Sequence, residues 1–208
     1  MNIKLNARHL LACTMALAFI LAGSVASAGP IIGSKHDFAT GTGQGKALGT
    51  ETETCKVCHT PHTSSTYTSG NTLPLWNRTL SSQSFTTYSS GLTLSQGTLV
   101  CLSCHDGATA LGDFGGATTS ATTAMTGTAN IGLDLGAAHP VGKVYVGTGE
   151  YKGTGTSLSD SGQTIADVLS SSKVACSTCH NVHGKTGVSK FLRGSNTNSA
   201  LCASCHDK

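Results

Sequence analysis

Hydrophobic side chains occur in short, separated clusters along this chain of 208 residues. Beyond residue 28 the apolar segments are residues 73–80, 97–102, 141–146 and 164–174, and Gly, Ser and Thr fill most of the sequence between them. A helical bundle or a layered sheet needs longer apolar runs with a regular period. The pattern therefore predicts a mostly irregular, coil-rich fold with short α- or 3-10 helices, little β-structure and no conventional hydrophobic core.

Three segments have a local pattern of their own. Residues 161–173 have the best helical pattern, with Ile165, Val168 and Leu169 on one stripe. Residues 141–151 predict a short hairpin that turns at its glycines. Residues 107–136, rich in Gly, Thr and Ala, predict a long surface loop, with disorder as the alternative.

The amino terminus has the pattern of a secretory signal peptide. Lys4 and Arg8 precede an apolar run from Leu10 to Ala22, and small residues before Gly29 predict cleavage there. This run is too short for a membrane span, and no other stretch is apolar enough to be one. We therefore expect residues 1–28 to be a signal peptide and the protein to be exported, with no transmembrane segment.

The charge of the remaining chain is close to balanced. Loss of two of the 13 basic residues leaves 11 against 10 acidic ones. The basic residues form no run or stripe of the kind that binds a phosphate backbone. The sequence therefore gives no indication of a nucleic-acid partner.

Every cysteine beyond residue 28 belongs to one of four C-x-x-C-H motifs. The motifs comprise Cys55, Cys58 and His59; Cys101, Cys104 and His105; Cys176, Cys179 and His180; and Cys202, Cys205 and His206. This motif attaches c-type haem: the thiols form two thioethers, and the histidine binds the iron from one face. Structural zinc or disulfides would explain the cysteines but not the histidine that follows each pair. We therefore predict four covalently attached haem c groups. We expect each motif to lie on one or two helical turns, because the spacing of its cysteines puts both sulfurs on one side of a helix.

Four histidines remain beyond residue 28, namely His36, His62, His139 and His183, and four irons need a second axial ligand. Met125 is the single methionine that could compete, and it could serve one haem at most. We therefore expect histidine on both faces of every iron. Such irons have no open position for a substrate, which predicts an electron carrier and not an enzyme.

Two motifs continue as C-x-x-C-H-x-x-H, which constrains the pairing of histidines. His62 follows His59 by three residues, on nearly the same side of a helical turn, so it must serve a haem other than the one His59 binds. The same holds for His183 and His180. The simplest assignment pairs His59 with His36, His105 with His62, His180 with His139, and His206 with His183.

The order of these parts repeats. Each half has a lone histidine, then C-x-x-C-H-x-x-H, then a spacer, then C-x-x-C-H-D. The pattern predicts one tetrahaem domain over residues 29–208, with approximate dihaem repeats at 30–110 and 137–208 joined by the Gly/Thr-rich loop. Haem should form the core, so we expect the haem-free chain to be disordered. The side chains expected to pack on haem are Leu75, Trp76, Phe85, Leu99, Ile165, Leu169, Phe191 and Leu201.

Several segments resemble a known family. The words CHTPH, LPLWNRT, CLSCHDG and HPVG and the carboxyl-terminal FLRGSNTNSALCASCHD are similar to the doubled C-x-x-C-H, outer-surface tetrahaem cytochromes of metal-respiring bacteria. The resemblance implies a homopolymer: subunits join end to end into extracellular filaments, and one distal histidine comes from the neighbouring subunit. By its position near the new amino terminus, His36 is the candidate for that donor. The resemblance also implies redox partner proteins or extracellular acceptors and a cell-surface location. A monomeric periplasmic shuttle is the alternative.

Overall fold

The computed structural model describes residues 31–39, 48, 52–60, 75–115, 122–159, 161–184 and 188–207. The helices are η2 (Thr54–Val57), α2 (Gln96–His105), η3 (Gly127–Ala129), α3 (Ile165–Val168), α4 (Cys176–Cys179), η4 (Ser189–Phe191), η5 (Thr197–Ser199) and α5 (Ala200–Ala203). The described residues contain no named strand, only nine isolated β-bridges. The predicted coil-rich fold class is confirmed. The predicted signal peptide, residues 1–28, lies outside the described residues.

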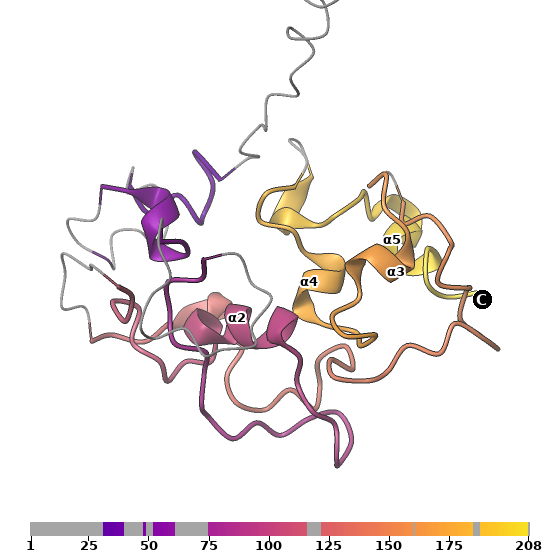
Figure 1. Ribbon diagram of the computed structural model, residues 1–208, viewed down its shortest axis with the longest axis horizontal. Coiled ribbons are helices and arrows are strands. Elements are labelled where there is room, and N and C mark those ends of the chain that lie inside the picture. The colour runs from indigo at the N-terminus through magenta and orange to yellow at the C-terminus, as the bar shows by residue number, and fades with distance from the viewer. Residues whose placement is uncertain are drawn as a thin grey trace, which may run out of the picture.

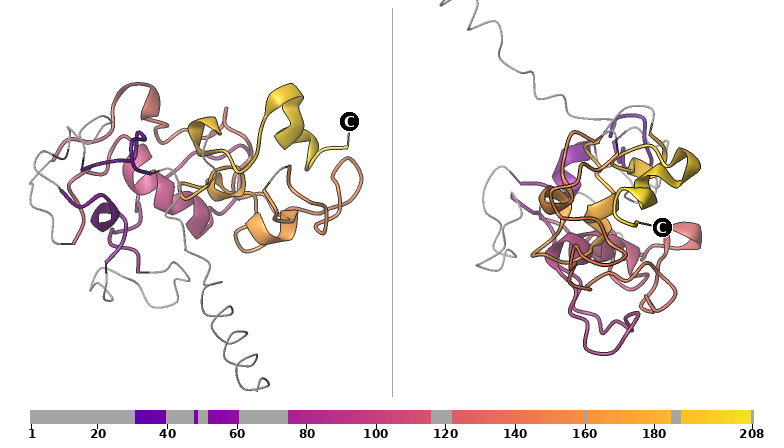
Figure 2. Two further views of the ribbon diagram at one scale, coloured as in Figure 1. Left: turned by 90° about the horizontal axis from the view of Figure 1, so that it is seen from above. Right: turned by 90° about the vertical axis from the view of Figure 1, so that its right-hand side faces the viewer.

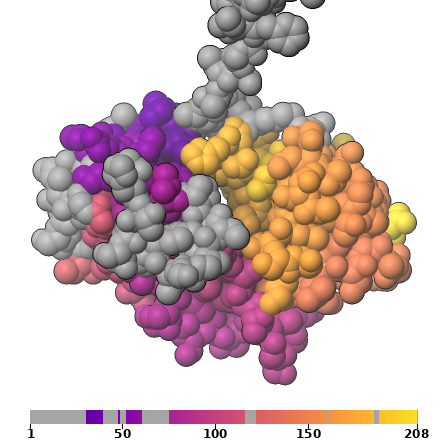
Figure 3. Space-filling view, in the orientation of Figure 1, coloured from indigo at the N-terminus to yellow at the C-terminus, as the bar shows by residue number. Residues whose placement is uncertain are grey.

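The helices are short, and none in the described ranges could cross a bilayer. Figure 1 shows the first half of the chain, in indigo and magenta, beside the second half, in orange and yellow. The left view in Figure 2 agrees with this arrangement, and Figure 3 shows the same division at the surface. Helices α2 and α4 contact each other at the boundary between the halves.

The contact between α2 and α4 depends on small side chains. A Cβ atom on Gly97 would overlap the hydroxyl of Ser177, so any larger residue here would require that side chain to move. The Gly97 N–H donates to the Ser170 hydroxyl at 3.2 Å, and the Cys176 N–H donates to the Thr98 hydroxyl at 3.4 Å. These hydrogen bonds fix the second C-x-x-C-H motif against the third.

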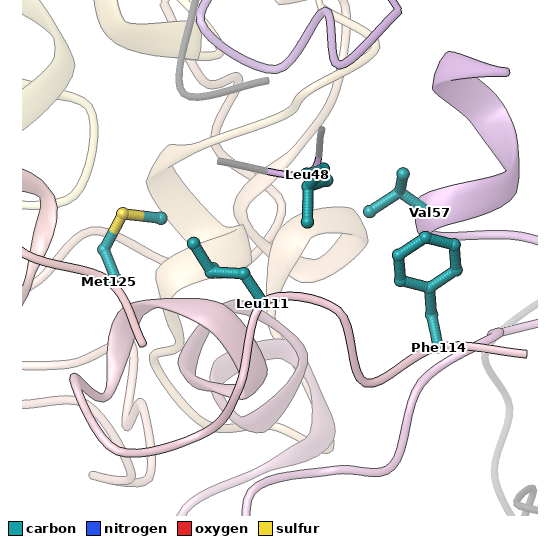
Figure 4. Close-up of a cluster of buried hydrophobic side chains, with 5 residues drawn as sticks. All are labelled: Leu48, Val57, Leu111, Phe114 and Met125. Atoms are coloured by element: carbon teal, nitrogen blue, oxygen red, sulfur yellow. The ribbon is translucent and has the colours of Figure 1, made fainter. Parts of the chain in front are cut away.

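Three small apolar clusters replace a single core. The first contains Leu48, Val57, Leu111, Phe114 and Met125 (Figure 4). The second contains Leu102, Leu135 and Val141, and the third contains Leu158, Val168 and Leu201. Among the side chains predicted to pack on haem, Ile165 and Leu201 are buried, whereas Leu75 is exposed.

The long Gly/Thr-rich loop is more than a surface connection. Its described parts, residues 107–115 and 122–136, contribute Leu111, Phe114 and Met125 to the first cluster. A bridge between Ala110 and Ala124 holds its two arms together. The prediction of a wholly superficial or disordered loop is therefore wrong for these residues, because its few apolar side chains are spaced to reach the first cluster together.

Two predicted elements differ from the structure. The pattern at 161–173 yields only the single turn of α3, which begins at a capping box in which Thr164 and Asp167 bond each other. The helix cannot continue through Ser171 and Ser172, whose φ values are 53° and 60°. The predicted hairpin at 141–151 is also wrong, because Val144 forms its bridge with Lys173 and not within the segment.

A Gly194→Ala variant should be less stable than the parent protein. A Cβ atom at this position would overlap the Ser159 carbonyl oxygen, and a backbone atom cannot rotate away. We expect the free energy of unfolding of the haem-loaded protein to fall by about 1–3 kcal/mol in denaturant titrations. Gly155→Ala is the control, because no atom lies within 4 Å of its Cβ position. Equal midpoints for the two variants would contradict this account of Gly194.

Candidate functional site

All four C-x-x-C-H motifs lie on short helical turns, as predicted. The first is on η2, the second ends α2, the third forms α4 and the fourth overlaps α5. In three of them the histidine N–H donates to the carbonyl of the first cysteine, at 2.8 Å for His59 and 3.0 Å for His180 and His206. One turn therefore places both cysteines on one side, with the histidine directly after them.

Six of the eight predicted iron ligands form three pairs in the structure. The ring centres are 6.0 Å apart for His36 and His105, 5.9 Å for His59 and His183, and 6.3 Å for His139 and His206. Two imidazoles on opposite sides of one metal need about 2 Å for each metal–nitrogen bond and about 1 Å from nitrogen to ring centre, which is about 6 Å in all. Each pair therefore has the separation that a single bound iron requires.

The structure pairs these rings differently from the simplest assignment by sequence. His36 lies beside His105 and not His59, and His183 lies beside His59 and not His206. His139 lies beside His206 and not His180. The assignment by sequence order was wrong because His183, which follows the third motif, lies beside the first motif, across the boundary between the halves. His62 lies outside the described residues. Among the described residues no histidine ring lies opposite His180.

Burial keeps the distal histidines neutral. Desolvation, with a smaller contribution from His105, lowers the pKa of His36 to about 4. Burial is also the main cause of the lowered pKa of His139 and of His183, and in each case the facing motif histidine adds to it. A neutral imidazole is the form that binds a metal, so the chain holds these rings ready for iron at neutral pH.

Two motif histidines are oriented by backbone carbonyls. The Nδ1 atom of His105 lies 2.7 Å from the Ala129 oxygen, and that of His180 lies 2.8 Å from the Lys190 oxygen. Because a carbonyl can only accept, each Nδ1 carries the proton, which leaves Nε2 free as the iron ligand. The η3 and η4 turns that supply these carbonyls were not identified as site elements from the sequence.

The motif cysteines border the apolar clusters. Cys58 and Cys104 pack against the first cluster, Cys176 against the second, and Cys179 and Cys205 against the third. Burial raises the pKa of Cys58 to about 12 and that of Cys179 to about 11. The thiols thus face apolar surroundings, which suit the flat hydrophobic ring of a porphyrin.

Cys101 and Cys176 meet at the contact between α2 and α4. The Cys101 thiol donates to the Gly97 carbonyl at 3.7 Å. Interaction with the neighbouring Cys176 thiol raises the pKa of Cys101, and the same interaction lowers the pKa of Cys176 to about 7. These residues are the first cysteines of the second and third motifs. Two cysteines from motifs in different halves of the chain are therefore neighbours.

Residues 75–77 return to the first motif and bond to it, and residues 191–193 bond to the third motif in the same way. We call these two segments the braces. The Thr60 N–H donates to the Leu75 carbonyl, and the Asn77 N–H donates to the Cys58 carbonyl, both at 2.9 Å. In the second half the Asn181 N–H donates to Phe191 and the Arg193 N–H donates to Cys179, at 2.7 Å and 2.9 Å. Bridges between His59 and Trp76 and between His180 and Leu192 complete the equivalence.

The side chains of the two braces also match. Asn77 donates from Nδ2 to the Lys56 carbonyl at 2.6 Å, and Arg193 donates from Nε to the Ser177 carbonyl at 2.8 Å. Lys56 and Ser177 each follow the first cysteine of their motif. From the sequence, Leu75, Trp76 and Phe191 of the braces were expected only to pack on haem. Both braces follow a C-x-x-C-H-x-x-H word, and this shared position is the signal that could have identified them.

A family model matches the carboxyl-terminal part of the chain. Residues 170–208, which include the third and fourth motifs, match the family model described as "Doubled CXXCH motif". No protein with a curated description matches the chain. The motifs indicate covalently bound c-type haem, and the matched segment contains the last two of them.

Proposed function

We propose that this protein transfers electrons through four c-type haems, each held between two histidines. The three pairs of facing histidine rings, with centres 5.9–6.3 Å apart, are the observation that carries the proposal. A haem with both axial positions filled exchanges single electrons and leaves no metal position for a substrate. The residues of this chain supply neutral nitrogen ligands and apolar surroundings, as expected of an electron carrier.

The proposed assignment gives each haem one motif histidine and one distal histidine. His59 and His183 bind the first iron, His105 and His36 the second, and His206 and His139 the fourth. By count, the remaining pair is His180 and His62 at the third. In this assignment each C-x-x-C-H-x-x-H word supplies its last histidine to the opposite half.

The attachment points support a path along the four motifs in order. Cys58 and Cys104 border one apolar cluster, which links the first and second motifs. Helices α2 and α4, which carry Cys101 and Cys176, contact each other, which links the second and third. Cys179 and Cys205 border another cluster, which links the third and fourth. Neighbouring haems attached at these positions would lie close enough to pass electrons along the chain.

The assembly of the protein has two proposed forms. The resemblance supports a subunit of an extracellular filament that takes one distal histidine from its neighbour, with His36 as the candidate. The position of His36 supports the other form, a monomeric shuttle with internal ligands. Its ring faces His105 of the same chain and stacks on Phe191 with ring centres 4.7 Å apart.

Exported, haem-loaded protein should have four covalently attached haems by mass spectrometry and a low-spin ferric spectrum at all four. Fewer haems, or a high-spin ferric population, would contradict the proposed function. Size-exclusion chromatography and negative-stain microscopy then separate the two forms. His36→Ala should abolish filaments if His36 is donated to a neighbour. In a shuttle it should leave the monomer intact and convert only the second haem to the high-spin state.

A further inference from the structure

Arg78 is a buried cation between the first two motifs. Its side chain is 2 % exposed. Its guanidinium donates to three backbone carbonyls, those of Leu111 at 2.8 Å, Ala110 at 2.9 Å and Ser103 at 3.1 Å. Ser103 lies inside the second motif, near the end of α2, where carbonyls lack partners within the helix. The charge is therefore fixed against the second motif by its backbone.

The positive charge of Arg78 has no carboxylate partner among the described residues. Its Nε–H is buried without a hydrogen bond there, and the ring of Phe114 lies 6.0 Å from the guanidinium carbon. Burying an unpaired charge is costly, and partial charges on carbonyls offset only part of that cost. A neutral donor could have satisfied carbonyls at lower cost, so the charge itself requires an explanation.

The nearby carboxylate of Asp106 is bound elsewhere. It accepts hydrogen bonds from the Ser81 hydroxyl at 2.7 Å and from the hydroxyl and N–H of Thr109 at 2.6 Å and 2.8 Å. The Ala108 N–H adds a fourth bond at 2.9 Å. Burial opposes ionisation, but these hydrogen bonds outweigh it and hold the pKa of Asp106 below its usual value. The second motif therefore has one fixed charge of each sign beside it.

The guanidinium acts on both neighbouring attachment sites. It exerts an electrostatic effect on the thiols of Cys58 and Cys104, which are the second cysteines of the first and second motifs. Its hydrogen bond to the Ser103 carbonyl, inside the second motif, joins it directly to that motif. The haem attached at Cys101 and Cys104 is therefore the one most exposed to this charge.

The second half has no arginine at the equivalent position. Because Asn77 corresponds to Arg193 in the matching braces, Arg78 corresponds to Gly194, which lies directly against Ser159. The fourth motif thus lacks the buried cation that the second motif has. Lys152 acts on Cys205, but its side chain is partly exposed, and solvent screens such a charge more strongly. The two halves differ electrostatically although their hydrogen bonds match.

We propose that Arg78 is a positioning residue that raises the reduction potential of the haem attached at Cys101 and Cys104. An iron that gains an electron loses one positive charge, so a fixed cation in low-dielectric surroundings stabilises the reduced form. This proposal rests on the proposed function, since it requires a haem at the second motif.

The test compares three variants of the haem-loaded protein by redox titration, with haem signals assigned by NMR. Arg78→Gln removes the cation, and we expect the ferrous-to-ferric ratio of the second haem at a fixed potential to fall about tenfold, a shift of about 59 mV for one electron. Arg78→Lys retains the charge and should keep most of the potential. Asp106→Asn removes the opposite charge and should shift the same haem in the opposite direction.

The outcomes separate this proposal from the proposed function. A wild-type protein without four haems defeats the proposed function, and the haem count establishes that before any variant is compared. Equal shifts for Arg78→Lys and Arg78→Gln, or no shift for the latter, would show that Arg78 is merely structural. If neither Arg78 variant incorporates haem, the potentials of the second and fourth haems in the wild-type protein test the proposal. The second haem must then have a higher potential than the fourth, and the reverse order overturns the proposal.

Discussion

Without haem, residues 29–208 are expected to show no cooperative unfolding transition and no fixed tertiary structure. The described residues bury thirteen hydrophobic side chains, and eleven of these are divided among three small clusters. Each buried side chain contributes about 1.5–3 kcal/mol, whereas ordering the backbone costs about 1–2 kcal/mol for every residue. Most described residues bury no apolar side chain at all, so the polypeptide alone cannot offset the loss of entropy.

The measurement compares two preparations of the same chain. Residues 29–208 produced in the cytoplasm under reducing conditions have no haem attached, and the exported protein is the haem-loaded reference. We expect a disordered far-ultraviolet circular dichroism spectrum and no thermal midpoint for the first preparation. A chain with all eight motif cysteines changed to serine controls for stray disulfides. A cooperative thermal transition in either haem-free preparation would contradict the haem-centred core.

His183→Ala should convert the first haem, and not the third or fourth, from low spin to high spin. His183 is only three residues beyond the third motif, yet its ring centre is 5.9 Å from that of His59. Loss of the second axial nitrogen leaves that iron five-coordinate or bound to water, which weakens the ligand field. One of four low-spin ferric signals should therefore disappear from the electron paramagnetic resonance spectrum.

A second variant identifies which haem is affected. Replacing Cys55 and Cys58 by alanine removes the first haem, and adding His183→Ala to that background should then produce no further high-spin signal. His139→Ala is the matched control. It should still produce a high-spin signal in the same background, because its ring faces His206, with ring centres 6.3 Å apart. A new high-spin signal from His183→Ala in the absence of the first haem would show that His183 serves another iron.

Local features of this protein could be predicted from its sequence because they depend on neighbouring residues. Each cysteine pair and its histidine lie within one helical turn, so their spacing alone indicates where haem attaches and that the chain forms short helices there. The coil-rich fold class followed from the scarcity of periodic apolar runs. The helix predicted for residues 161–173 failed at Ser171 and Ser172, where the backbone turns to bring Lys173 beside Val144.

The residues that complete the site come from distant segments, and the sequence could not assign them. Arg78 is a polar position in the spacer by its pattern, and only the folded chain brings it against Ser103 and leaves it without a carboxylate among the described residues. The Ala129 carbonyl that orients His105 belongs to the loop that was predicted to be superficial. The role of Ala129 has no sequence signal, because every residue has a backbone carbonyl. The role of Arg78 has none either, because it depends on which distant carbonyls the fold brings to its side chain.

The sequence by itself determined the chemistry: four attachment motifs, eight candidate axial histidines and a chain with too few apolar runs for an ordinary core. Only the tertiary structure decided which histidines face each other. In the folded chain α2 and α4 contact each other across the boundary between the halves, and His183 of the second half lies beside His59 of the first. Spacing along a chain fixes geometry within one helical turn, whereas contacts between distant segments depend on the path of everything that connects them.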